Sequence, residues 1–182
     1  EAGTRPVTFS RNLYVESDDF LETPIPKYKR LYPDGPECRL KGAYLIKCTG
    51  CVKDEQGNVV EILATYDPDS KGGNPADGRK VKGATIHWVD AETAVDAQVR
   101  LYDNLFADEN PDGGDKDFLD CLNPGSLEVL EGCKLEASLA NAQPSDRFQF
   151  LRLGYFCADS KDSKPGALVF NRAVSLKDGF KK

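Results

Sequence analysis

A chain of 182 residues can form one medium-sized domain or two small ones, and either can bury a hydrophobic core. Hydrophobic residues make up 40% of the chain and charged residues 30%, which is ordinary for a globular protein in water, and no apolar run approaches the ~20 residues of a membrane helix. The net charge of −6 argues against a protein that coats nucleic acid without regard to sequence. No signal peptide stands at the start. Because the chain has no methionine and opens on Glu-Ala-Gly-Thr-Arg, we expect an excised or processed fragment.

Strand patterns dominate the chain. Two apolar-rich runs flank a polar turn that carries Gly57 and Asn58, which predicts a β-hairpin in the first half. Around Trp88, polar and apolar residues alternate with the period of a half-buried strand, and we expect Trp88 to be largely buried in the core of that region. The expected strands lie at residues 43–52, 59–66, 84–89, 99–106, 148–157 and 168–176.

Helical signals are few and short. We expect helical turns at Asp90–Val95 and Asp115–Leu122, each opened by an acid that can cap a helix start, with Asn123-Pro124 ending the second. Short strands with glycine and proline turns and few helices predict an all-β fold of the barrel or sandwich class. Turn-rich breaks near residues 24–26 and 110–114 indicate two lobes.

The six cysteines are interpreted as reduced thiols of a cytosolic protein, with three disulfides of a secreted domain as the alternative. Cys48 and Cys51 have the spacing of a zinc knuckle, but no second such pair exists and His87 is the only histidine, so we expect no metal. Residues 108–113 begin like a calcium loop. The twelfth position is Leu119, which cannot supply the required carboxylate.

Motifs of catalysis do not occur in the sequence. There is no Gly-x-Ser-x-Gly elbow, no phosphate-binding loop and no dinucleotide fingerprint. His87 lies in an apolar strand beside Trp88, where a core or groove histidine is the simpler interpretation. We therefore expect no active site within these residues.

A basic cluster lies between Lys27 and Lys41. Five cations and two anions give this segment a local balance of +3, and Tyr28 stands among the cations. Unpaired RNA bases stack on aromatic or guanidinium planes and bond through their edges, so the cluster is a candidate RNA-binding site. A solvated charged surface is the alternative. Farther along, residues 148–152 place an amide and a guanidinium between apolar residues, which on composition alone is a strand with two outward polar positions.

Several short sequence motifs resemble those of the anticodon-binding domain of the glutaminyl-tRNA synthetase family. They follow in the family's order over nearly the whole chain: Lys-Tyr-Lys-Arg-Leu (27–31), Gly-Ala-Tyr-Leu-Ile-Lys (42–47), Gly-Arg-Lys-Val-Lys-Gly (78–83), Ile-His-Trp (86–88), Arg-Leu-Tyr-Asp (100–103), Phe-Gln-Phe-Leu-Arg (148–152) and Val-Phe-Asn-Arg (169–172). The resemblance implies two β-barrels. The distal barrel would comprise residues 27–105 and the proximal barrel residues 1–26 and 106–182.

The resemblance also implies the function. The parent protein would be a glutamine–tRNA ligase that uses ATP with Mg²⁺, and this chain would bind the anticodon loop of tRNA(Gln). The adenylation signatures of class I enzymes, His-Ile-Gly-His and Lys-Met-Ser-Lys-Ser, do not occur in these residues, so we expect no cofactor here and assign ATP to the missing catalytic domain. We expect a cytoplasmic monomer without DNA or membrane partners.

The residues that the resemblance implies for tRNA binding are Lys27, Lys29, Arg30, Arg39, Gln149 and Arg152. Arginine presents a donor fork suited to guanine, and glutamine can both donate to and accept from uracil, which fits anticodons ending in U-G. Arg30 and Arg152 are the expected base readers. Lys29 and Arg39 would hold phosphates or the first base, and Lys27 would act electrostatically. Strict strand alternation puts Gln149 and Arg152 on opposite faces, so joint contact requires a bulge or a strand end.

Three alternatives remain at this stage. A related glutamyl-tRNA synthetase shares these barrels. A secreted, disulfide-bonded β-sandwich that binds carbohydrate or calcium is a different class, and a count of free thiols separates it from the first reading. A ribosomal-type RNA-binding barrel resembles the same fold, and analogy of fold alone does not exclude it.

Overall fold

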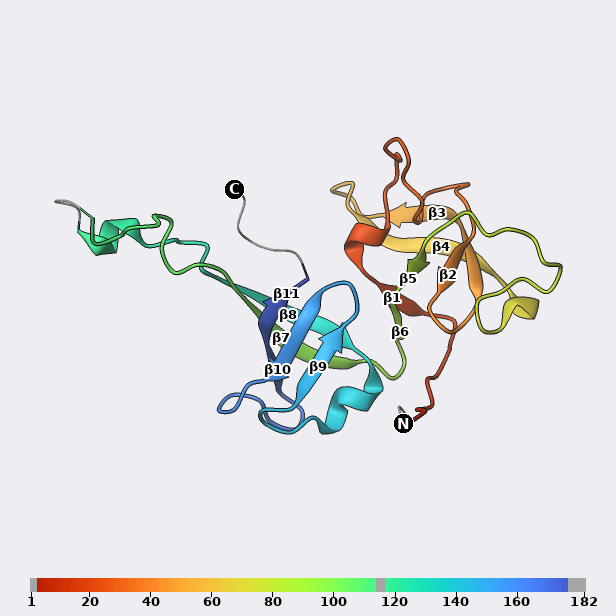
Figure 1. Cartoon of the computed structure of the whole chain (residues 1–182). Coiled ribbons are helices and arrows are strands. Elements are labelled where there is room, and N and C mark those ends of the chain that lie inside the picture. Colours follow the sequence, from red (N-terminus) through yellow and green to blue (C-terminus); the bar gives the residue numbers. More distant parts are fainter. Residues whose placement is uncertain (1–2, 114–116, 177–182) are drawn as a thin grey trace. The chain divides into compact units, whose positions relative to one another are not determined.

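The computed structural model describes residues 3–113 and 117–176 (Figure 1). The chain divides into two compact units: the first unit is Val7–Glu92, and the second unit is Thr93 onward together with the residues up to Pro6. The units and the predicted barrels differ in two segments. Residues 7–26, predicted for the proximal barrel, belong to the first unit, and residues 93–105, predicted for the distal barrel, belong to the second. The run 77–106, which carries two of the most distinctive phrases, therefore contributes to both units.

The first unit contains a four-stranded sheet in the order β4-β3-β2-β5 and a two-stranded ribbon of β1 and β6. The predicted hairpin is confirmed, since β3 and β4 pair antiparallel around the turn at Gly57. β5 joins β2 in parallel, which sets Arg39 opposite Thr85. The elements are β1 (Leu13–Val15), η1 (Ser17–Asp19), β2 (Cys38–Leu40), β3 (Leu45–Lys53), β4 (Val59–Asp67), η2 (Pro68–Ser70), β5 (Thr85–Ile86) and β6 (Trp88–Asp90).

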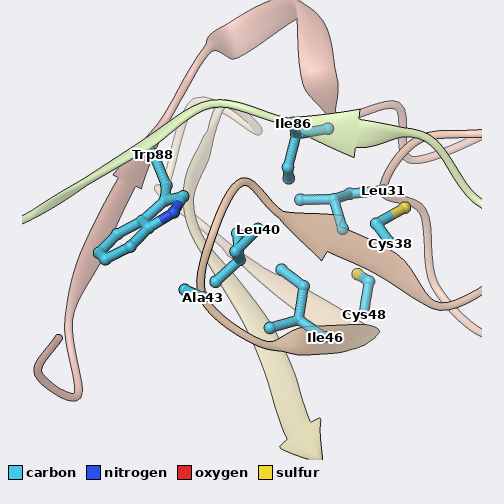
Figure 2. Packing of buried hydrophobic residues seen from close by; sticks show 8 residues of the cluster. All are labelled: Leu31, Cys38, Leu40, Ala43, Ile46, Cys48, Ile86 and Trp88. Carbon is cyan, nitrogen blue, oxygen red and sulfur yellow. The ribbon is translucent and has the colours of Figure 1, made fainter. Parts of the chain in front are cut away.

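Figure 2 shows the core of the first unit, with side chains from the 31–48 segment facing Ile86 and Trp88. Its buried members are Leu31, Cys38, Leu40, Ala43, Ile46, Cys48, Ile86 and Trp88. Trp88 is only 8% exposed, and its indole Nε1 donates a hydrogen bond to the carbonyl of Lys41 at 3.1 Å, so its predicted burial is confirmed. The single strand expected at 84–89 is interrupted at the half-buried His87, which separates β5 from β6.

The second unit is built on a five-stranded sheet in the order β8-β7-β11-β10-β9. β7 and β11 run parallel and the other neighbours run antiparallel. Its core contains Phe156, Leu168 and Phe170, and the ring of Phe150 stacks on Phe156 at 4.3 Å. The elements are β7 (Val95–Tyr102), η3 (Phe118–Cys121), β8 (Leu127–Leu135), η4 (Ala137–Asn141), β9 (Arg147–Phe150), β10 (Gly154–Ala158) and β11 (Leu168–Ser175).

One predicted strand of the second unit is in fact a hairpin. The run 148–157 forms β9 and β10, which pair antiparallel with Gln149 opposite Tyr155. The turn between them closes with a hydrogen bond from the Leu153 amide to the Phe150 carbonyl at 3.0 Å. Arg152 occupies the turn with a φ of 67°. The turn was missed because only Gly154 marks it, and Gly154 already belongs to the second strand. The late pairing with residues 168–176 is confirmed as β10 with β11.

The helix predicted at Asp90–Val95 is wrong. Asp90 ends β6, residues 91–93 form a turn, and β7 begins at Val95. The acid does cap a local structure, since its carboxylate accepts a hydrogen bond from the Glu92 amide at 3.1 Å, but that structure is a single turn between strands. The second prediction holds in shorter form as the 3₁₀ helix η3, capped by Asp117 at 3.0 Å from the Leu119 amide. The starting residue expected for it, Asp115, lies outside the described residues.

The all-β prediction is confirmed, with one sheet-based unit on each side of residue 92. Within the described residues, neither main sheet closes a hydrogen-bonded ladder between its two edge strands. None of the helices in residues 3–113 and 117–176 is long and apolar enough to cross a membrane.

Candidate nucleic-acid interface

The basic segment of the first unit is attached to the η1 region by its main chain. The Leu31 amide donates to the Asp19 carbonyl at 2.9 Å, and the Leu21 amide donates to the Leu31 carbonyl at 3.0 Å. Leu31 is 2% exposed and belongs to the core. This burial fixes the position of the preceding residue, Arg30, at the surface above the core.

Arg30 is held through one of its three nitrogens. Nη1 donates to the main-chain carbonyl of Asp18 at 3.1 Å and lies 3.2 Å from a carboxylate oxygen of Asp19. The Asp19 side chain is fully buried, whereas that of Arg30 is 38% exposed. Within the described part of the chain, every polar contact of Arg30 uses Nη1. Nε and Nη2, which together form a two-donor edge, remain for a ligand.

Arg39 is held in a different way. It lies in β2 between buried Cys38 and buried Leu40, so strand alternation turns it away from the core. Its Nε donates to the carbonyl of Gly73 at 2.8 Å, in a loop where Gly73 has a φ of +87° that favours glycine. The contact uses the Nε edge and leaves the two terminal nitrogens as a donor fork.

Lys27 and Lys29 are both exposed. Lys27 has a φ of 66° beside a turn closed from the Tyr28 amide to the Ile25 carbonyl at 3.1 Å. The carbonyl of Lys29 accepts from the Ala84 amide at 2.7 Å, which fixes the main chain and leaves the ammonium group in water. The half-buried Tyr28 donates through its hydroxyl to the Asp18 carbonyl at 3.1 Å, and burial raises the pKa of that hydroxyl.

The three cations of the Gly-Arg-Lys-Val-Lys-Gly phrase divide into two groups. Arg79 forms ion pairs with the carboxylates of Glu37 at 2.8 Å, Asp67 at 2.6 Å and Asp77 at 3.0 Å. These ion pairs hold the loop between β4 and β5, so Arg79 has a structural role. Hydrogen bonding to Arg79 lowers the pKa of Glu37. Lys80 and Lys82 are exposed, and no ion pair joins either to an acid among residues 3–113 and 117–176.

Lys82 is a candidate that sequence reasoning missed. It lies two residues before Ala84, whose amide bonds to the Lys29 carbonyl, so the two lysines lie on adjacent segments. The three cations of this motif are visible in the sequence, but the sequence does not show which of them forms ion pairs with acidic residues. Glu37, 42 positions before Arg79, is the partner that separates the structural cation from the available ones.

In the second unit, Gln149 and Arg152 lie on the β9–β10 hairpin, and both are exposed. β9 ends at Phe150, so Arg152 lies in the turn and the strand alternation that would place it opposite Gln149 no longer applies. The predicted condition for joint contact, a strand end, is therefore met. Exposed Tyr155 lies opposite Gln149 in the ladder and adds an aromatic ring to this surface.

None of the six cysteines, all of which lie within the described residues, forms a disulfide. Cys38 and Cys48 are buried in the first core, and burial raises the pKa of Cys38 to about 11. Cys48 lies at a register shift of β3, where its sulfur faces the Gly50 carbonyl at 3.5 Å. In the described residues, no group of three or more histidine, cysteine or acidic side chains gathers as a metal site. The calcium-like loop is instead closed by Asp108, whose carboxylate accepts from the Asn110 amide at 3.0 Å.

Two family models match this chain, one over residues 1–67 and one over residues 85–159, and both describe the anticodon-binding domain of class I tRNA synthetases for glutamate and glutamine (E and Q). The two matches contain the six candidate residues predicted from the sequence, and Lys82 lies between them. The chain therefore belongs to the family of class I glutamyl- and glutaminyl-tRNA synthetase anticodon-binding domains. This membership removes the secreted β-sandwich and the ribosomal-type barrel as alternatives.

Curated relatives sharpen the resemblance within that family. The chain is 56% identical over 182 residues to the glutamine–tRNA ligase of Pseudomonas putida, covering 99% of this chain and 32% of that protein. Glutamine–tRNA ligases of Pseudomonas syringae pv. tomato and Clostridium kluyveri are 53% and 52% identical, again over 99% of this chain and 32% of theirs. The chain thus spans about a third of the length of the relatives it matches.

Proposed function

We propose that this chain recognises the anticodon loop of tRNA(Gln) within a glutamine–tRNA ligase, an enzyme that joins glutamine to its tRNA at the expense of ATP. Family membership supports tRNA binding, and the names of the relatives favour the glutaminyl over the glutamyl enzyme. The single observation that carries the assignment of residues is the way in which the Arg30 guanidinium is held. It is anchored by one nitrogen and keeps a two-donor edge in solvent.

The candidate residues divide into readers and holders. A guanidinium with two free donors in one plane matches the paired acceptors of a guanine edge, and the amide of Gln149 can donate to and accept from a uracil. Arg30 and Gln149 are therefore two of the proposed base readers. Arg152, whose exposed side chain lies in the β9–β10 turn beside Gln149, is the third. Arg39, whose remaining fork also fits a phosphate, and the exposed Lys27 and Lys29 are the proposed contacts to the backbone or to the first base.

The rest of the reaction is assigned to the longer protein. Neither adenylation signature of the class I enzymes occurs in these 182 residues, so we propose that ATP and Mg²⁺ bind outside them. We also propose that the protein acts as a monomer in the cytoplasm. A monomer fits the exposed or half-buried position of the candidate residues, each of which lies within one unit of a single chain.

Comparison of Arg30→Ala with Lys29→Ala tests the division into readers and holders. A bidentate arginine–base contact is worth about 1–3 kcal/mol of discrimination by analogy with groove readout, and it depends on the base. Arg30→Ala should therefore weaken binding of tRNA(Gln) and flatten the preference over anticodon-altered tRNA. Lys29→Ala should weaken both RNAs alike and reduce the salt dependence, because a phosphate contact does not depend on sequence.

Equilibrium binding at several salt concentrations gives both quantities for the chain and its variants. In the full-length enzyme, Arg30→Ala should lower kcat/KM for tRNA and leave the use of glutamine and ATP nearly unchanged. An equal loss of affinity for cognate and altered anticodons would show that Arg30 does not read a base. Equal affinity of the unchanged chain for both RNAs would contradict anticodon recognition itself.

A further inference from the structure

We propose that Asp19 is a positioning residue for anticodon readout: its buried carboxylate holds the Arg30 guanidinium in the orientation in which the Nε–Nη2 edge meets the base. The inference rests on the proposed function of this surface and adds to it a residue that does not touch the RNA. Asp19 is one of four buried polar side chains named among the described residues, with 0% exposure.

The main chain of Asp19, which carries the carboxylate, is fixed on both sides. The Asp19 amide donates to the Glu16 carbonyl at 2.9 Å, which closes η1, and the Asp19 carbonyl accepts from the Leu31 amide at 2.9 Å. The residue that carries the carboxylate and the residue next to Arg30 are thus joined directly. Because Leu31 is buried, the distance between the acid and the guanidinium is set by core packing and not by a flexible surface side chain.

The two anchors act on the same nitrogen. Nη1 of Arg30 forms an ion pair with the Asp19 carboxylate at 3.2 Å and donates a hydrogen bond to the Asp18 carbonyl at 3.1 Å, so consecutive residues hold the same nitrogen. A guanidinium is planar, and fixing one nitrogen in two directions also fixes the plane of the other two. The free edge is therefore oriented before any RNA arrives, which lowers the entropic cost of forming a bidentate contact.

The burial of the Asp19 carboxylate carries an energetic cost that its partners must offset. A carboxylate removed from water is strongly unfavourable unless it is paired and hydrogen-bonded, and a surface arginine alone would be satisfied by an exposed acid. Arg39 and Arg79 show the alternatives within the same unit: Arg39 is held by a neutral carbonyl, and Arg79 by carboxylates that are 21–60% exposed. Of these three arginines, only Arg30 pairs with a fully buried acid.

The Asp18 carbonyl that holds Arg30 also accepts a hydrogen bond from Tyr28. Tyr28 donates its hydroxyl to this oxygen at 3.1 Å, so the aromatic ring and the guanidinium share one acceptor. The ring of Tyr28 lies 6.2 Å from that of Tyr32. A base read by Arg30 would therefore approach a surface in which a neighbouring aromatic is fixed by the same turn.

A charge-matched pair of variants tests the inference. Asp19→Asn and Asp18→Asn each remove one negative charge from neighbouring positions, but only the first alters the side chain that contacts Arg30, since Asp18 uses its main-chain carbonyl. Both variants of the 182-residue chain should bind RNA somewhat more tightly at low salt. Asp19→Asn alone should reduce the preference for the cognate over the altered anticodon by roughly fivefold to tenfold.

Two further measurements separate positioning from folding. In an Arg30→Ala background, Asp19→Asn should cause no additional loss of preference, because the group that it positions is gone. In the unchanged chain, NMR should show slower rotation of the Arg30 guanidinium than of the exposed Arg11, and this holds even if the Asp19 variants fail to fold.

The outcomes are distinct. A folded Asp19→Asn chain with unchanged anticodon preference would overturn the positioning role, as would guanidinium rotation in Arg30 as fast as in Arg11. If Arg30→Ala itself leaves the preference intact while the unchanged chain still discriminates, the assignment of Arg30 as a reader fails, and this inference with it. If the unchanged chain does not discriminate, anticodon recognition itself fails.

Discussion

In the first unit, Arg30 and Arg39 are held by bonds from their side chains, and in the second unit the path of the β9–β10 hairpin sets where Gln149 and Arg152 lie. Arg30 is anchored by a buried acid and a carbonyl. Arg152 is exposed on a two-strand turn, where its left-handed φ of 67° determines where its side chain begins. The comparison teaches that similar donor groups can be presented by two unlike means, one sensitive to side-chain replacement and the other to backbone strain.

Loss of Trp88 should damage the first of these arrangements most severely. The ring is 8% exposed and lies 5.4 Å from the ring of Phe9 in an edge-on packing. Trp88→Ala should lower the free energy of unfolding by about 3–5 kcal/mol through lost burial and the cavity left behind. Urea denaturation measures the loss, and hydrogen exchange should locate it in residues 7–92. Tyr66→Ala, at a ring that is 54% exposed, is the control and should cost far less. A Trp88→Ala chain that melts within a degree or two of its parent would contradict this placement.

A change at Gly154 should damage the second arrangement by a smaller amount. Gly154 has a φ of 151°, and a Cβ there would lie 2.4 Å from the carbonyl oxygen of Val174 on the neighbouring strand. Gly154→Ala should therefore cost about 1–3 kcal/mol by straining the start of β10. Thermal denaturation measures this cost.

The same variant separates the two units in binding. Anticodon preference that depends on Gln149 and Arg152 should weaken, while the effect of Arg30→Ala should stay as large as in the parent. Gly50→Ala is the matched control, since its Cβ would meet nothing within 4 Å and its φ is not left-handed. Equal stability of the two alanine variants would show that the hairpin tolerates the added atom.

The smallest expected effect distinguishes the backbone of Arg152 from its side chain. Arg152→Ala and Arg152→Gly both remove the guanidinium, but only glycine relieves the left-handed conformation. The glycine variant should be more stable than the alanine variant by roughly 1 kcal/mol. Both should lose the same fraction of affinity for tRNA(Gln). If the glycine variant binds better than the alanine variant, the backbone of the turn itself takes part in recognition.

Local patterns predicted a large part of the fold. The β3–β4 hairpin followed from two apolar runs around Gly57, and the burial of Trp88 followed from the alternation around it. Alternation also explains why Arg39 faces outward between two core residues. These features depend on neighbours within a few positions, which a sequence displays directly.

Features that depend on distant partners could not be predicted in the same way. Arg79 pairs with Glu37 from 42 positions away, and the acid that holds Arg30 lies in a separate segment. The turn at Arg152 carries a residue that rarely adopts a left-handed conformation, so no turn signal marked it. Asp90 has the chemistry of a helix cap, but the strand that follows at Val95 pairs with β8 and overrides that preference.

The division of the chain at residue 92 has a consequence for synthesis on the ribosome. The first unit is one uninterrupted stretch, Val7–Glu92, whereas the second unit joins its first residues to a segment more than 130 positions later, through the ion pair of Arg5 with Glu136. At about 5–20 residues per second, the whole first unit emerges several seconds before the second is finished. All residues of the site around Arg30 and Asp19 are therefore synthesised before Glu136, the partner of Arg5, is translated.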